Sequence, residues 1–200
     1  MYMLVDIFPY QIYKTSVTLN DLEKDAMRSY LSTLFTSMPA NNHILEKGDS
    51  KSTHAVNKEL HLNEVFQPLV NQINQHSLNY WANLHFATEH RPKIVSMWAN
   101  LHQPGGFTDL HSHATHIMAG CYYLDFPASS GKLVFQNPAE YATHYYPFTV
   151  SGKENFLEYV ADVSQNDLII FPAHIKHNTK PNRSTLPRIS INFNLNQEEI

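Results

Sequence analysis

Two histidines stand two residues apart in the stretch LHSHATHIMAGCYYL, residues 110–124. In a strand, residues i and i+2 point to the same face, with their Cα atoms roughly 6.5–7 Å apart. His111 and His113 can therefore converge on one metal ion, and neutral imidazole suits iron, zinc, copper and nickel. Asp109 has the same parity and is an alternative ligand, whereas His116 has the opposite parity in a regular strand.

A third ligand is expected from the stretch NDLIIFPAHIKHNTKPN, which contains His174 and His177. The apolar run 168–171 in this stretch has the composition of a buried strand, and Pro172 marks the turn that follows it. A histidine just beyond such a strand can face back into the mouth of a barrel. The residues alone leave both histidines open as the third ligand.

An arginine and a serine, Arg188 and Ser190, also stand two residues apart, within the otherwise apolar stretch PRISINFNL. An arginine that points into a barrel needs an anion, because leaving it unpaired there costs several kcal/mol. Its planar guanidinium suits a carboxylate, with the serine hydroxyl as a further donor. The alternative interpretation is an exposed edge strand with Arg188 in solvent.

The elements that must position these residues are short strands in the second half of the chain. Runs rich in β-branched and aromatic residues, separated by turn sequences, predict strands at residues 93–102, 116–126, 131–138, 155–163, 166–173 and 188–195. Before them, Asn20 and Glu23 resemble a capping box that opens a helix over 21–35. Helical spacing of apolar residues predicts a second helix over 62–86, with Pro68 near its start or at a kink.

We expect one domain over residues 1–200, with 1–92 as a helical support region with loops and 93–196 as a β-barrel core. Many short strands in one block favour a sandwich or barrel with helices packed outside it. The predicted fold class is therefore mostly β with N-terminal helices. The polar segments 41–58 and 140–155 are expected to frame the mouth of the barrel.

The composition argues against several kinds of partner. The net charge is −4 without a basic stripe, so no nucleic-acid duplex is expected. Cys121 is the only cysteine, which argues against a disulfide framework and a thiolate zinc cluster. No signal-peptide pattern and no run of about 20 apolar residues occurs, so we expect no membrane segment and a cytoplasmic location. A monomer and a homodimer are both compatible with the sequence.

The ordered set H-x-H, a distal histidine and R-x-S resembles the Fe(II)- and 2-oxoglutarate-dependent oxygenases. HSH matches the first element at His111 and His113, KHN the second at His177, and RIS the third at Arg188 and Ser190. The surrounding sequence looks most like small phage and bacterial members of the prolyl-hydroxylase-like branch. The resemblance implies a double-stranded β-helix, a jelly-roll or cupin-like barrel, located in the host cytoplasm if the chain is phage-encoded.

The resemblance also implies two cofactors, Fe(II) held by the three histidines and 2-oxoglutarate as cosubstrate. Arg188 and Ser190 would then bind the distal carboxylate of 2-oxoglutarate. His177 is favoured over His174, because the family's distal ligand precedes its anchor by close to the 11 residues that separate His177 from Arg188. No catalytic residue beyond the metal ligands is expected, since the difficult chemistry belongs to the iron.

Tyrosines and asparagines on neighbouring strands often hold 2-oxoglutarate in this family, and Tyr123 and Asn100 are the candidates here. Strand alternation lets only one of Tyr122 and Tyr123 face inward, and we favour Tyr123. The sequence departs from the usual family pattern at His113, where most members have Asp or Glu. Three histidines leave the charge of Fe(II) unbalanced until dianionic 2-oxoglutarate binds.

The implied activity is oxidation of a peptide residue or a small molecule, usually hydroxylation, with release of succinate and CO2. Two alternatives stay open. The first is a cupin-like three-histidine metal enzyme that does not use 2-oxoglutarate, in which Arg188 grips the substrate itself. The second is a non-catalytic barrel that binds a structural metal or none. The fold alone does not separate these functions.

Overall fold

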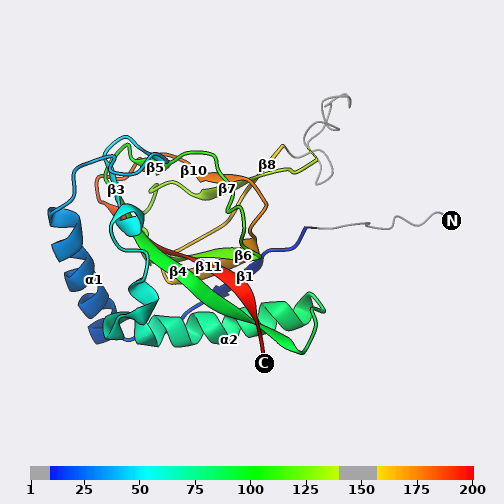
Figure 1. Ribbon diagram of the computed structural model, residues 1–200. Helices are drawn as coiled ribbons and strands as arrows, with labels where there is room; N and C mark the ends of the chain where they lie inside the picture. The colour runs from blue at the N-terminus through cyan, green and yellow to red at the C-terminus, as the bar shows by residue number, and fades with distance from the viewer. Residues whose placement is uncertain (1–9, 140–156) are drawn as a thin grey trace, which may run out of the picture.

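The computed structural model describes residues 10–139 and 157–200, and antiparallel β-sheets dominate it (Figure 1). The strands are β1 Tyr13–Ser16, β2 Glu46–Lys47, β3 Ser50–Ser52, β4 His90–His102, β5 Phe107–Thr108, β6 Met118–Asp125, β7 Leu133–Gln136, β8 Glu158–Val160, β9 Asp167–Pro172, β10 His177–Thr179 and β11 Arg188–Glu199. A larger sheet has the order β1-β9-β6-β11-β4-β3, a smaller sheet β10-β7-β8, and β2 pairs with β5.

The first helix, α1 Asp21–Thr36, begins at the predicted capping box. The Asn20 side chain accepts a hydrogen bond from the Glu23 N–H, and the Glu23 carboxylate accepts one from the Asn20 N–H. These two bonds satisfy N–H groups that a helix start otherwise leaves unpaired. The capping box is therefore confirmed.

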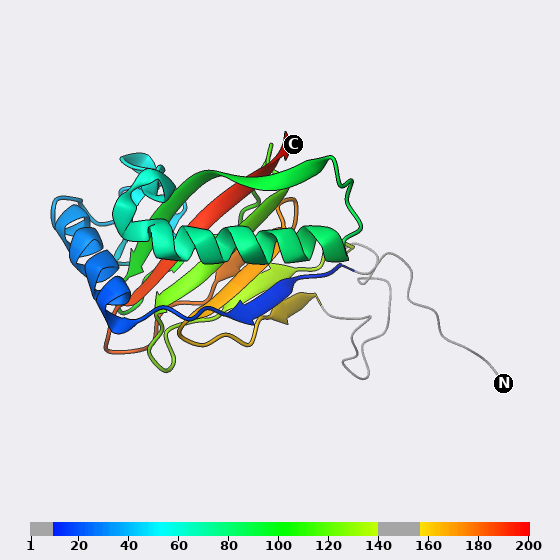
Figure 2. The same ribbon diagram turned by 90° about the horizontal axis from the view of Figure 1, so that it is seen from below.

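The second helix, α2 Gln67–Asn83, begins five residues later than the predicted range 62–86. Short 3-10 turns, Leu60–Leu62 and Glu64–Phe66, precede it, and another spans Thr53–Ala55. Pro68 lies in the first turn of α2, where its missing N–H has no intrahelical partner to lose. The helix crosses the face of the larger sheet (Figure 2).

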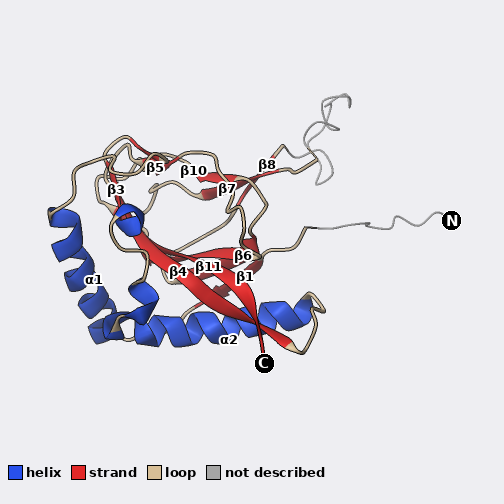
Figure 3. Ribbon diagram, in the orientation of Figure 1, coloured by secondary structure: helices blue, strands red, loops and turns tan. Residues whose placement is uncertain are grey.

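Strand alternation divides the side chains of the larger sheet between two environments. In β11, Ile191, Phe193 and Leu195 pack in the core between this sheet and the helices. The intervening residues of β11 line a cavity on the opposite face: Arg188, Ser190, Asn192 and Asn194. The helices lie on the side of the larger sheet that faces away from the smaller sheet (Figure 3). The face of the larger sheet that lines the cavity is therefore not covered by the helices.

The observed class, mostly β with N-terminal helices, confirms the expectation. The region before residue 93 contributes more than helices and loops, because β1 pairs with β9, β3 with β4 and β2 with β5. These strands are short and largely polar, so cross-strand pairing and not hydrophobic periodicity sets their conformation. The predicted mouth segment 140–155 lies outside the described residues, as does the start of the predicted strand 155–163. Among the described helices, none is long and apolar enough to cross a membrane.

Candidate active site

A cavity of about 480 Å³ lies on the inner face of the larger sheet, and strand register decides which side chains line it. Asn100 of β4 pairs with Ser190 of β11, and Ser190 pairs in turn with Tyr123 of β6. These three side chains form a polar row on the cavity wall. The adjacent row consists of Trp98, Asn192 and Cys121.

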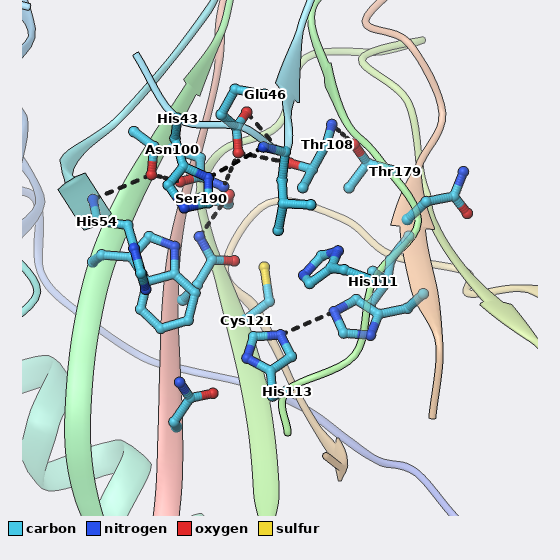
Figure 4. A pocket seen from close by; sticks show the side chains of 18 of the residues that line it. His43, Glu46, His54, Asn100, Thr108, His111, His113, Cys121, Thr179 and Ser190 are labelled. Atoms are coloured by element: carbon cyan, nitrogen blue, oxygen red, sulfur yellow. Dashed lines mark hydrogen bonds between the residues drawn. The ribbon is translucent and has the colours of Figure 1, made fainter. Parts of the chain in front are cut away.

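Three histidines from two separated segments, His111, His113 and His177, meet at this cavity, and Figure 4 labels the first two. His111 and His177 form an antiparallel bridge, with N–H···O distances of 3.0 and 2.8 Å. The His113 N–H donates to the Ala173 carbonyl at 2.9 Å. One ligand nitrogen from each histidine lies within 4.8 Å of the other two. The regular strand expected through His111 and His113 is not formed, because the chain turns away after the bridge; backbone bonds to the segment around His177 bring the rings together instead.

Backbone carbonyls orient two of the three rings. His111 Nδ1 donates to the Asp109 carbonyl at 2.8 Å, and His177 Nδ1 donates to the Ile175 carbonyl at 2.9 Å. Because a carbonyl can only accept, each Nδ1 carries the proton and each Nε2 offers its lone pair. The Nε2 atoms of His113 and His177 lie 3.2 Å apart. Because His177 Nε2 carries no proton, its lone pair can bind a cation placed between the two rings, so the donor set fits a metal ion.

Burial also keeps these imidazoles neutral. It lowers the pKa of His113 to about 3, and it lowers the pKa values of His111 and, strongly, His177. Neighbouring imidazoles add to the effect, since His111 disfavours a positive charge on both His113 and His177. Metal ions bind the neutral form, so protons compete weakly for this site near neutral pH.

The alternative ligands lie elsewhere. His174 is exposed, and its ring centroid lies 5.9 Å from that of Tyr10. Asp109 is exposed, and its carboxylate accepts a hydrogen bond from the Leu110 N–H. In the described parts of the chain, the metal-ligand cluster contains neither of these residues, nor His116. The geometry therefore favours His177 as the distal histidine.

Arg188 is fully buried and reaches the cavity wall. Its Nη1 donates to the carbonyls of Ser130, at 2.7 Å, and Gly131, and its Nη2 donates to Thr179 Oγ1 at 3.0 Å. Nε and Nη2 also face His102 Nδ1, at 3.3 and 2.6 Å. Neutral protein acceptors thus meet all of its nitrogens, so burial of Arg188 does not by itself require an anion as its direct partner.

The nearest balancing charge is Glu46, a buried carboxylate that sequence analysis did not single out. Its Oε2 lies 2.7 Å from His102 Nε2. Its Oε1 accepts from Asn100 Nδ2 at 3.0 Å and from Thr108 Oγ1 at 3.2 Å, and Figure 4 shows these three residues. Burial raises the pKa of Glu46 to about 7, although Thr108 and the charge of Arg188 oppose the rise. Glu46 stands in a polar, turn-rich stretch and carries no signal in the sequence, whereas His102 shares strand parity with Asn100 and could have been noticed.

The other residues considered as contacts for 2-oxoglutarate, Tyr123, Tyr122 and Asn100, differ in whether their polar groups already have hydrogen-bond partners. Tyr123 is buried and its hydroxyl has no hydrogen-bond partner, so a ligand oxygen in the cavity would satisfy it. Tyr122 faces the helical core and donates to Asn166 at 3.2 Å. Asn100 is already engaged, because it accepts from Ser52 Oγ at 2.7 Å as well as donating to Glu46. The unpartnered Tyr123 hydroxyl beside a buried arginine fits an anionic ligand.

Aromatic rings form a further wall of the cavity. The ring centroids of His54 and Trp98 lie 5.0 Å apart, and those of Trp98 and the metal-site residue His113 lie 5.8 Å apart. His43 continues the series, 4.8 Å from His54. Burial lowers the pKa values of His43 and His54, so this wall is uncharged near neutral pH. The segment 41–58, expected at the mouth of the barrel, supplies two of these rings.

A three-histidine cluster and a buried arginine on the inner face of an antiparallel barrel define the class as a metal-dependent enzyme with a double-stranded β-helix fold. The sequence comparison gives the particular family. Residues 96–194 match the family described as "Putative 2OG-Fe(II) oxygenase", and the chain belongs to these Fe(II)- and 2-oxoglutarate-dependent oxygenases. No curated protein sequence matches the chain.

Solved structures share the fold at low sequence identity. A Pseudomonas putida prolyl-4-hydroxylase is 12% identical with a TM-score of 0.58, covering 94% of this chain and 92% of that chain. HygX from Streptomyces hygroscopicus, solved with nickel and 2-oxoglutarate, is 12% identical with a TM-score of 0.60, covering 94% and 83%. The viral collagen prolyl hydroxylase of Paramecium Bursaria Chlorella virus-1, solved with 2-oxoglutarate, is 13% identical with a TM-score of 0.56, covering 94% and 96%.

These findings confirm the predicted fold class and family. Fe(II) and 2-oxoglutarate are accordingly the cofactors of this enzyme. Both alternatives left open by the sequence, a cupin-like enzyme without 2-oxoglutarate and a non-catalytic barrel, lose support from the family assignment. The three neutral imidazoles suit a metal ion, and the buried Arg188 with the Tyr123 hydroxyl suits a carboxylate.

Proposed function

We propose that this oxygenase holds Fe(II) through His111, His113 and His177. The observation that carries the proposal is the orientation of the rings. Carbonyls accept from the Nδ1 atoms of His111 and His177 and leave their Nε2 lone pairs free, and one ligand nitrogen of each of the three histidines lies within 4.8 Å of the others. Neutral imidazole is a suitable ligand for iron. A site without a carboxylate leaves the metal's charge to be balanced by the cosubstrate.

The distal carboxylate of 2-oxoglutarate would be held by Arg188 and Ser190, with Tyr123 and Asn100 as further contacts. All four side chains line the same cavity as the three histidines. Supporting this role, the Tyr123 hydroxyl is buried without a partner, and the guanidinium of Arg188 supplies the positive charge that a carboxylate requires. Asn100 would contribute mainly by shaping the pocket, since its amide is already hydrogen-bonded.

The proposed reaction is hydroxylation of a peptide residue or a small molecule. When bound, Fe(II) and 2-oxoglutarate supply the oxidising chemistry from O2, with succinate and CO2 released. The protein's residues orient the cosubstrate and exclude water from the cavity. We propose that residues 1–200 act as one oxygenase domain, because the segment 41–58 supplies part of the cavity wall that the barrel core completes.

The substrate would enter along the wall of Trp98 and His54, next to His113. An uncharged wall of flat rings favours an apolar group, such as the ring of a prolyl residue or a carbocycle. The fold neighbours include proteins named for prolyl hydroxylation and one solved with the small molecule hygromycin B. Both substrate types therefore belong in the first screen.

The test is to incubate the Fe(II)-loaded protein with 2-oxoglutarate, O2 and a panel of proline-containing peptides and small molecules. Succinate formation above the substrate-free rate, together with the gain of one oxygen atom in one panel member, is the expected result. Trp98→Ala should reduce the stimulated rate more than the substrate-free rate. Succinate that no substrate stimulates, or an oxidised product without added oxygen, would contradict hydroxylation.

A further inference from the structure

The side of Arg188 that faces away from the cavity is closed by His102. The two residues are direct cross-strand partners in the pairing of β11 with β4. His102 is buried and, unlike Arg188 and Glu46, is not part of the cavity wall. It therefore stands behind the guanidinium, where it can fix the orientation of that group without contacting a ligand.

The hydrogen bonds at His102 have one consistent direction. Arg188 can only donate, so His102 Nδ1 must accept from Nη2 at 2.6 Å and from Nε at 3.3 Å. The single ring proton then sits on Nε2, which donates to Glu46 Oε2 at 2.7 Å. This Arg188–His102–Glu46 chain carries a positive charge at one end and a carboxylate at the other. The neutral imidazole between them is favoured because burial lowers the pKa of His102 strongly.

Glu46 is itself held in place by donors from two other elements. Asn100 of β4 and Thr108 of β5 both donate to Oε1, at 3.0 and 3.2 Å. The carboxylate reaches this position because β2 pairs with β5, with Glu46 opposite Thr108. Glu46 lies outside the segment 96–194 that matches the family, so the N-terminal region adds a component to the cosubstrate pocket.

We propose that His102 and Glu46 are positioning residues that fix the plane of the Arg188 guanidinium and thereby set the affinity for 2-oxoglutarate. The inference rests on the proposed role of Arg188 as the anchor. Without the His102 ring, Nε would lose its acceptor in a buried site, Nη2 would keep only Thr179, and the guanidinium would turn toward another acceptor. The guanidinium of Arg188 would then no longer be held in the orientation that binds the distal carboxylate of 2-oxoglutarate.

A simpler account makes the opposite prediction. If Glu46 were only a buried negative charge near the pocket, its removal would strengthen the binding of dianionic 2-oxoglutarate. Under the positioning account, Glu46→Gln weakens binding, because His102, Asn100 and Thr108 all donate to a carboxylate that has two acceptor oxygens. A glutamine offers one oxygen and turns its NH2 group toward one of these donors.

The experiment compares the wild-type protein with Glu46→Gln, His102→Leu and His102→Asn. Each protein is loaded with Mn(II), and its dissociation constants for Mn(II) and for 2-oxoglutarate are measured by calorimetry. We expect Glu46→Gln and His102→Leu to weaken 2-oxoglutarate binding roughly tenfold or more, as loss of a charge-assisted hydrogen bond does, with Mn(II) binding unchanged. His102→Asn retains an acceptor near the position of Nδ1 and should recover part of the affinity.

Matched controls are Glu198→Gln, which removes a carboxylate paired with Arg91 and Lys93, and His76→Asn, which removes a histidine bonded to Tyr13. Both should leave the 2-oxoglutarate affinity at the wild-type value. Unchanged or tighter binding in Glu46→Gln, with normal thermal unfolding, would overturn the proposal. If His102→Leu does not fold, His102→Asn and Glu46→Gln decide the question. Failure of the wild-type protein to bind 2-oxoglutarate would instead contradict the proposed function.

Discussion

At the scale of single residues, the site separates metal binding from anion binding. The three histidines are neutral, since burial lowers their pKa values, and their Nδ1 protons at His111 and His177 are tied to carbonyls. The positive charge resides on Arg188, whose donors are met by neutral acceptors and, through His102, by Glu46. The metal site and the anchor can therefore be altered independently.

Substitution of a ligand histidine should abolish iron binding. We expect His111→Ala and His177→Ala to lose tight Fe(II) binding, since each removes one of three converging nitrogens. His174→Ala should bind iron as the wild type does, because His174 is exposed and contacts Tyr10 instead. Metal content after anaerobic loading and desalting is the measurement. Retention of iron by His177→Ala together with its loss in His174→Ala would show that the distal ligand is misassigned.

The raised pKa of Glu46 makes a prediction about stability. Its pKa is about 7 in the folded protein against an ordinary 4.5, because burial disfavours the carboxylate. The folded state thus binds this proton more tightly, and the stabilisation is complete below the ordinary pKa and is lost as pH rises through about 7. Between these values the free energy of unfolding should fall by up to about 3 kcal/mol from this group alone.

The measurement is urea denaturation of the metal-free wild type and Glu46→Gln across this pH window. Histidines that do not contact Glu46 contribute equally to both proteins, so the difference between the two curves isolates Glu46 together with its partner His102. We expect the wild type to lose stability relative to the variant as pH rises. Two parallel curves would contradict a raised pKa.

At the scale of elements, the register of β4, β11 and β6 builds the site. Pairing sets Asn100, Ser190 and Tyr123 in one row and places His102 beside Arg188. Sequence periodicity predicted the strands and predicted that Arg188 and Ser190 both face the barrel interior. Such predictions are possible because the alternation of side chains between the two faces of a strand depends only on neighbouring residues. Periodicity could not supply the cross-strand neighbours, which depend on register between segments far apart in the chain. The parity of His102 with Asn100 is visible in the sequence, but its contact with Arg188 depends on this register.

The turn before β7 offers a test of how Arg188 is supported. Gly131 has φ +85°, its carbonyl accepts from Arg188, and an added Cβ would lie 2.0 Å from the Lys180 carbonyl oxygen. Gly131→Ala should destabilise the protein by about 3 kcal/mol and weaken 2-oxoglutarate binding. Gly105 has φ +87° with open space around its Cβ position, so Gly105→Ala should cost only about 1 kcal/mol. Thermal unfolding and calorimetry check both effects, and equal destabilisation by the two substitutions would contradict the steric argument.

At the scale of the whole molecule, the N-terminal region helps to build the cavity as well as supporting the barrel. Its helices cover the larger sheet, and its short strands β2 and β3 bring Glu46 and Ser52 to the polar network. The sequence predicted a barrel with helices outside it, and the structure confirms this. The part played by residues 46–52 could not be predicted, because such short polar runs become strands only by pairing with distant segments. Here β3 pairs with the long β4, and β2 with the equally short β5.

The most direct test of the central claim is anaerobic titration of the Fe(II)-loaded protein with 2-oxoglutarate, followed by visible absorption. We predict a weak charge-transfer band from bidentate binding of 2-oxoglutarate to iron. In Arg188→Ala, iron should still bind, while the titration midpoint should shift by at least roughly thirtyfold, as expected for loss of a buried charged partner. Bound iron without a band in the wild type would contradict the account and favour a three-histidine enzyme that does not use 2-oxoglutarate.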